Sequence, residues 1–141
     1  MGSQLSLLGR FSSGVIEDTG IRAFNPLTTV PQGNILKPAL SGLSMISLDY
    51  LARLHQTFSV NFSGACFVRS DLGTYMAYPV AGVSNENYFL GTELFGRLLW
   101  SPASDIQINM GGGLFLPSLG DVAPDADMLW RVEINLVLSL Y

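Results

Sequence analysis

Charged residues recur inside stretches of this 141-residue chain in which every second residue is apolar. They are five arginines and three carboxylates: Arg10, Asp49, Arg53, Arg69, Glu93, Arg97, Arg131 and Glu133. Guanidinium and carboxylate groups that face one enclosed space can pair across strands, or they can line water and attract solutes of opposite charge. The sequence therefore allows a salt-bridged interior, a conduit whose excess of arginine favours anions, or a soluble domain that turns these groups to bulk water.

No pattern in the sequence predicts catalysis, a cofactor or a metal site. His55 is the only histidine and lies in a short predicted turn, and no Gly-x-Ser-x-Gly elbow occurs. The glycines at 111–113 lie inside an alternating stretch with no helix after it, which argues against a phosphate-binding loop. A catalytic cluster at the rim would have to use Asp71, Asp121 and Asp125. We therefore expect a protein that is not an enzyme.

Six segments of the chain have a period of two, and the eight charged residues lie in five of them: 4–14, 43–54, 58–70, 88–100, 105–117 and 128–141, of which 105–117 contains none of the eight. Such alternation predicts β-strands with one apolar and one polar face. In the fourth segment Tyr88, Leu90 and Leu94 share the apolar face, and Glu93 and Arg97 share the polar one. The segments run about 11 to 14 residues. A usual soluble strand has roughly 5 or 6 residues, whereas a tilted strand that crosses a bilayer needs about 9 to 11.

Short and long connections between these segments alternate strictly. Bacterial outer-membrane barrels have the same alternation, because their periplasmic turns are short and their outer loops are long. Nothing in a soluble meander requires it. The short connections are 55–57 and 101–104, and the long ones are 71–87, 118–127 and the region from about Gly14 to Gly42.

These patterns predict an all-β fold, an antiparallel up-and-down meander that forms a transmembrane β-barrel or part of one. Six strands are clear, and the long first connection has room for two more, which would make eight. Glu17 and Asp18 make that region a poor lipid-facing strand, and Arg22 is expected in a loop. We expect one β-barrel domain over residues 1–141, either complete or the C-terminal portion of a larger barrel.

The composition agrees with a barrel better than with a soluble domain. Charged residues are 13% of the chain and hydrophobic residues 48%, yet no apolar run reaches the roughly 18 residues of a spanning helix. The net charge of −4 argues against a nucleic-acid partner, and the single lysine, Lys37, argues against a basic membrane-surface patch. The single cysteine, Cys66, rules out an intramolecular disulfide. The first residues lack a signal-peptide pattern, so we expect a mature form or a fragment.

Aromatic residues lie near the ends of several segments, on the apolar face. A transmembrane barrel places aromatic side chains at both membrane interfaces, so these residues predict an aromatic girdle. For each residue alone, ordinary apolar burial is the simpler explanation. The five residues are Tyr50, Phe58, Tyr88, Trp100 and Trp130.

The stretch from residue 88 onward resembles the late strand–turn–strand hairpin of bacterial outer-membrane channels, particularly those of the alginate-export type. The matching residues are Gly91, Glu93, Asp105, Gly113, Phe115, Pro117 and Gly120. The last segment, which ends on Tyr141, is similar to the aromatic-ended strand that barrel-insertion machinery reads. The resemblance covers roughly residues 88–141. It implies a bacterial outer-membrane location, with the lipid bilayer and the insertion machinery as partners.

The expected function is a porin-like channel or exporter for small solutes, with a preference for anions. Small and polar residues on the inward faces, such as Ser59, Asn61 and Asn109, leave room for water. One alternative is a structural outer-membrane barrel whose lumen is plugged by ion pairs, and another is a soluble β-sandwich binding module. A barrel of six strands would also need missing N-terminal strands or further copies of the chain to close.

Overall fold

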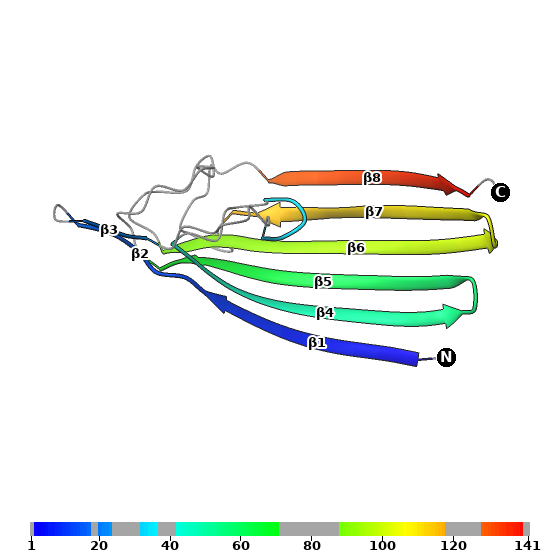
Figure 1. The fold of residues 1–141 in the computed structure, drawn as a ribbon, viewed down its shortest axis with the longest axis horizontal. Coiled ribbons are helices and arrows are strands. Elements are labelled where there is room, and N and C mark those ends of the chain that lie inside the picture. The colour runs from blue at the N-terminus through cyan, green and yellow to red at the C-terminus, as the bar shows by residue number, and fades with distance from the viewer. Residues whose placement is uncertain are drawn as a thin grey trace.

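The computed structural model describes residues 2–17, 20–23, 32–36, 42–70, 88–117 and 128–139. Six strands form one antiparallel sheet in the order β1-β4-β5-β6-β7-β8, and none of the described residues is helical (Figure 1). The predicted all-β meander is therefore confirmed. The sheet is not closed: within the described ranges, β1 and β8 each have one edge that pairs with no strand. The strands are β1 (Gly2–Phe11), β4 (Leu43–His55), β5 (Phe58–Arg69), β6 (Phe89–Ala103), β7 (Ile106–Leu116) and β8 (Leu129–Leu138).

The long first connection contains two further strands, but they do not join this sheet. β2 (Gly14–Glu17) and β3 (Gly20–Ala23) pair only with each other, as a short hairpin. The possible count of eight strands is thus right for the chain and wrong for the sheet. Arg22, which the sequence placed in a loop, belongs to β3 because it pairs opposite Val15.

The connections divide the sheet into two ends. Two-residue turns join β4 to β5 and β6 to β7, and both lie at the end where the chain starts and finishes in Figure 1. The strand ends that border the long connections all lie at the opposite end. We call these the turn end and the loop end. The predicted alternation of short and long connections is confirmed.

The strand register keeps one face polar and the other apolar across all six strands. One row of partners on the polar face runs Ser6, Asp49, Ser63, Phe95, Gly113 and Arg131. The next row, on the apolar face, runs Leu7, Leu48, Gly64, Leu94, Leu114 and Trp130. Because side chains alternate along a strand, each such row repeats the sorting two residues further on.

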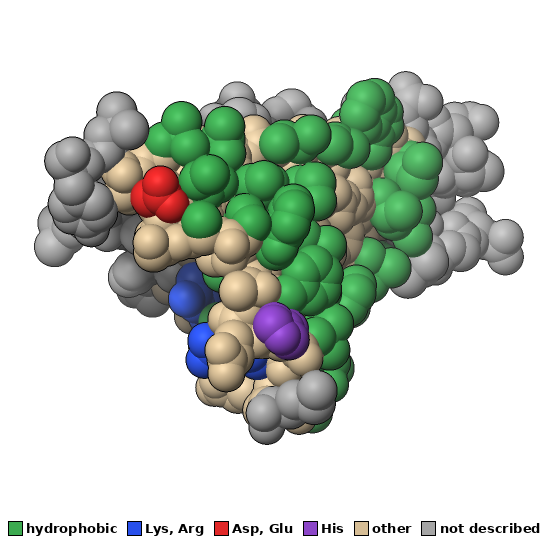
Figure 2. All heavy atoms as spheres, turned by 90° about the vertical axis from the view of Figure 1, so that its right-hand side faces the viewer, with side chains coloured by type: hydrophobic (Ala, Val, Ile, Leu, Met, Phe, Trp, Pro, Cys, Tyr) green, Lys and Arg blue, Asp and Glu red, His purple; other side chains and the backbone are tan. Residues whose placement is uncertain are grey.

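The apolar face is exposed. Leu7 is 74% exposed, Trp130 72% and Ile134 73%, and the same holds for residues on the strands between them. Figure 2, which looks onto the turn end, shows hydrophobic side chains along the convex flank of the sheet. The Lys and Arg side chains visible in that view lie on the concave side. The chain thus buries little of its largest apolar surface against itself.

A small core lies instead on the polar face, near the loop end. The rings of Phe67 and Phe115 pack with their centroids 6.1 Å apart. Ile35 and Leu36, from the long first connection, pack against this cluster and cover it. The core therefore fixes a connecting segment onto the sheet. Its buried members are Leu43, Met45, Ala65, Phe67, Leu90 and Phe115.

Leu90 is one place where the alternation predicted the wrong face. The ladder shifts there, since Phe67 pairs with Gly91 and Val68 with Phe89, so Leu90 is an extra residue. Gly91 has φ +148°, a conformation that favours glycine. The bulge turns Leu90 away from the apolar face and into the core, where it is fully buried.

The glycines of β7 give a test of this packing. A Cβ at Gly113 would overlap the Leu94 carbonyl oxygen and lie 2.8 Å from the Phe95 Cα atom, whereas one at Gly9 would meet nothing within 4 Å. We expect Gly113→Ala to lower the free energy of unfolding by about 1–3 kcal/mol, because backbone cannot yield to a methyl group as a flexible side chain can. Gly9→Ala is the control and should change it little. Urea unfolding in detergent measures both, and equal effects would contradict the close approach of β6 and β7.

Candidate functional site

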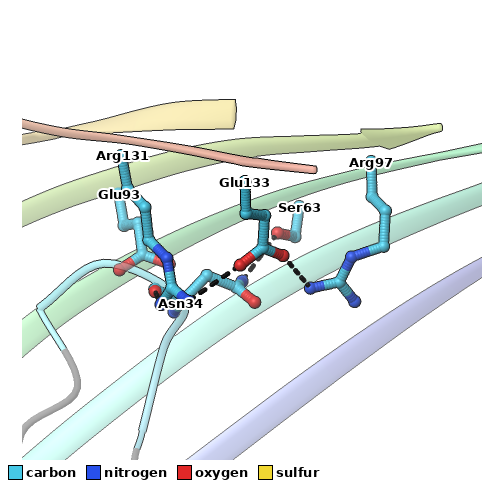
Figure 3. Close-up of polar contacts among 6 residues, drawn as sticks. All are labelled: Asn34, Ser63, Glu93, Arg97, Arg131 and Glu133. Atoms are coloured by element: carbon cyan, nitrogen blue, oxygen red, sulfur yellow. Dashed lines mark hydrogen bonds and ion pairs between the residues drawn. The ribbon is translucent and has the colours of Figure 1, made fainter. Parts of the chain in front are cut away.

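The candidate site lies on the polar face, where charged side chains of β6 and β8 meet a segment of the first long connection. That segment, residues 32–36, lies over the sheet, and we call it the strap. Figure 3 shows its Asn34 among side chains of β5, β6 and β8. The alternation of β6 and β8 points Glu93, Arg97, Arg131 and Glu133 toward this side. The site is therefore assembled from strands and from a connection far away in the sequence.

Glu93 is the main attachment of the strap. Its Oε1 accepts a hydrogen bond from the backbone N–H of Asn34 at 2.6 Å. Its Oε2 accepts from the N–H groups of Ile35 at 2.9 Å and Leu36 at 3.2 Å. The Glu93 residue is only 2% exposed. Three backbone donors on one carboxylate offset the desolvation of a buried charge, and such charge-assisted bonds are stronger than neutral ones.

Further contacts hold the strap from other strands. The side-chain amide of Asn34 donates to Ser63 Oγ at 3.3 Å, and Arg131 Nη1 donates to the Asn34 carbonyl oxygen at 2.9 Å. Arg10, on β1, donates to the side-chain oxygen of Gln32. Gly33 has φ +83°, and a Cβ there would lie 2.8 Å from Phe67 Cζ and 2.9 Å from Glu93 Oε2. The fit of the strap thus requires glycine at position 33.

Glu133 forms an ion-pair cluster with two arginines beside the strap (Figure 3). Its Oε1 lies 3.1 Å from Arg97 Nη2, and its Oε2 lies 2.8 Å from Arg131 Nη2. Gly111 lies between Arg97 and Glu133 in the ladder and leaves room for the carboxylate. The side chains of Arg97, Arg131 and Glu133 are 45%, 37% and 32% exposed. The cluster is open to solvent and has one surplus positive charge.

The other predicted charges lie apart from this cluster. Arg53 is exposed at the turn end and donates to the Gln56 carbonyl oxygen at 3.1 Å. Asp49 accepts from Ser47 Oγ at 3.4 Å. Arg69 is buried at the loop end of β5. The eight charges therefore do not form one continuous ladder, and the ion pairs found among them join Glu133 to Arg97 and Arg131.

The predicted girdle residues occupy several levels of the sheet. Phe58 and Trp100 pair opposite each other at the turn end. Tyr88 is exposed just before β6, and Trp130 is exposed near the start of β8, both toward the loop end. Tyr50 lies opposite Leu5 and Phe62, away from both ends of β4. Four of the positions thus lie toward strand ends, and Tyr50 lies between them.

The residue pattern did not predict the strap. A Gly-Asn pair at 33–34 is typical of a tight turn, but nothing in the residue pattern says that the turn folds back over the sheet. Glu93 offered the best available signal, because its ladder neighbours are Ala65 and Phe115 rather than an arginine. A carboxylate placed among apolar neighbours must find donors elsewhere.

The contacts of Glu93 predict how hydrogen exchange will respond to substitution. Glu93→Gln replaces one acceptor oxygen with an NH₂ group that faces backbone N–H donors. We expect the amides of Asn34, Ile35 and Leu36 to exchange roughly tenfold faster or more, since each lost charged hydrogen bond is worth about 1.5–3 kcal/mol. Glu133→Gln is the matched control and should change these amides much less, because its carboxylate bonds to arginines. Equal exchange in both variants would contradict the role of Glu93.

Within the part of the chain that the structure describes, no three His, Cys, Asp or Glu residues converge as metal ligands would. No helix among those residues is long and apolar enough to cross a membrane. The chain matches no model of a known protein family, and no curated protein matches its sequence.

Proposed function

We propose that this chain forms part of the wall of a bacterial outer-membrane channel that passes small solutes and favours anions. The observation behind this proposal is the sorting of side chains over six long strands, with exposed apolar residues on the convex side and charged residues on the concave side. The fold itself is compatible with a β-barrel wall. A transmembrane barrel turns its apolar face to lipid and its polar face to the lumen.

Strand length and exposure support the membrane part of the proposal. The six strands have 10 to 15 residues, enough for a tilted crossing. An apolar face of this extent is costly in water and needs a cover. Lipid covers such a face without a second protein layer. Arg97, Arg131 and Glu133 lie on the other face, so no charge of this cluster would enter the hydrocarbon.

The concave face supports the channel part of the proposal. A hollow of about 550 Å³ at the turn end is lined by Arg53, Ser59 and Ser101, among others. Toward the loop end, the surplus charge of the Arg97–Glu133–Arg131 cluster faces the same side. Water and small anions can approach both regions. Positively charged rings select anions in other pores.

The two open edges support membership in a larger barrel. Inside a bilayer, backbone N–H and C=O groups at the free edges of β1 and β8 must find partners, because no water is available there. Further strands, from chain outside the described ranges or from another copy, would complete the lumen. We also propose insertion by the machinery that assembles outer-membrane barrels. Closure without these additions would leave six strands, fewer than the eight of the smallest common barrels.

The strap favours one second candidate, a structural barrel with a closed lumen. Residues 32–36 cover part of the concave face, and Glu133 occupies two arginines. In that case the charges stabilise the wall and no solute passes. A soluble β-sandwich is the remaining alternative, and it would require a second sheet over the apolar face. A chain that is monomeric and cooperatively folded without detergent would favour the sandwich.

Lipid exposure of the apolar face can be tested on β8. Ile134→Arg should destabilise folding into lipid vesicles by about 2–4 kcal/mol, the cost of arginine near the bilayer midplane. Asn135→Arg is the matched control, because Asn135 follows Ile134 in sequence but faces the polar side, where an added charge should be tolerated. Denaturant titration of the vesicle-folded protein measures both. Similar costs for the two variants would contradict a lipid-facing Ile134.

Conductance across a planar bilayer tests the channel. The parent should conduct with a preference for anions, and Arg97→Glu or Arg131→Glu should shift that preference toward cations by reversing one charge at the cluster. Arg97→Lys keeps the charge and should preserve the preference. Salt-gradient reversal potentials give the selectivity of each variant. A folded, inserted parent that is electrically silent would rule out the channel and leave the structural barrel.

A further inference from the structure

The geometry points to Glu93 as a specificity-determining residue that works through the strap. Glu93 fastens the strap to the wall, and the fastened strap in turn covers the negative charge of Glu93. The position of the strap therefore sets two properties together, the width of the lumen and its charge selectivity. This inference rests on the proposed channel function and adds a means of controlling it.

The strap is attached to the sheet mainly through Glu93. Glu93 accepts hydrogen bonds from three backbone N–H groups of the strap, whereas Ser63 and Arg131 each make one hydrogen bond with Asn34. Loss of the Glu93 carboxylate therefore removes the acceptor of three hydrogen bonds at once. Ile35 and Leu36 then lose the hydrogen bonds that hold their backbone over the core. Displacement of the strap would open the concave face beside β6.

The strap also covers the negative charge of Glu93. With the strap in place Glu93 is 2% exposed, while Arg97, Arg131 and Glu133 stay accessible and sum to one positive charge. A solute beside the strap thus contacts the two arginines directly, whereas three backbone N–H dipoles of the strap offset the charge of Glu93. A displaced strap would expose the Glu93 carboxylate on the same face, and that charge would cancel the surplus. Release of the strap should therefore widen the lumen and remove its anion preference.

Two substitutions separate these effects, because both release the strap but only one keeps the charge. Gly33→Val places side-chain atoms where Phe67 and Glu93 already lie, at a φ of +83° that a β-branched residue rarely adopts. Glu93→Gln releases the strap and also removes the carboxylate. We expect both variants to conduct more than the parent. Gly33→Val should lose the anion preference, whereas Glu93→Gln should retain it.

A covalent closure of the strap provides the control. Asn34→Cys and Ser63→Cys replace two side chains that now contact each other at 3.3 Å, in a background where Cys66 is changed to serine. A short bis-maleimide that joins the two thiols would hold the strap against β5. Adding this bridge to the Gly33→Val or Glu93→Gln channel should return its conductance to the parental level. If one of the single variants folds poorly, the conductance of the other variant with and without the bridge still tests the inference.

The measurements distinguish failure of this inference from failure of the proposed function. If the parent conducts and hydrogen exchange shows a released strap, unchanged conductance would overturn the gating role. The same change in selectivity in Gly33→Val and Glu93→Gln would overturn the role of the covered charge. A parent that never conducts would overturn the channel function, and the selectivity role with it. Increased conductance in both variants, with the anion preference lost in Gly33→Val and retained in Glu93→Gln, would support the inference.

Discussion

The pairing register of each strand in this sheet cannot shift by even one residue, and the rest of the structure depends on that constraint. Because side chains alternate, a slip by one residue would turn an arginine to the apolar side and a leucine to the polar side. The ladders are regular through the middle of every strand. Their irregularities lie toward strand ends, at Arg53/His55, Phe67/Val68 and Trp100/Ala103. The polar and apolar faces therefore stay separate through the middle of the sheet.

The polar face follows different packing rules from the apolar one. Small residues on β7 make room for large neighbours, since a Cβ at Gly111 would lie 2.9 Å from Phe95 Cζ and 3.0 Å from Glu133 Cγ. The Glu133 cluster is accessible to water, whereas the Glu93 carboxylate is buried and accepts from three backbone donors. The second arrangement is local and geometrically demanding, because it needs several backbone donors in one place.

Period-two alternation was enough to predict the six strands of the sheet, its two short turns and the common face of Arg97, Arg131 and Glu133. It works because a strand's side-chain directions depend only on its own backbone. The strap and the inward turn of Leu90 could not be predicted in this way. Asn34 meets Glu93 across 59 positions of sequence, and Leu90 changes face through a bulge at Gly91. Both depend on contacts between strands that no single segment encodes.

The contacts of the strap also have a mechanical consequence for the shape of the sheet. Arg10 lies on β1 and Arg131 lies on β8, which are the opposite edges of the six-stranded sheet. The two arginines bind Gln32 and Asn34, which are only two residues apart. Because the strap binds both edge strands, it limits how far the two edges of the sheet can move apart. The curvature of the sheet is then limited by contacts within this chain.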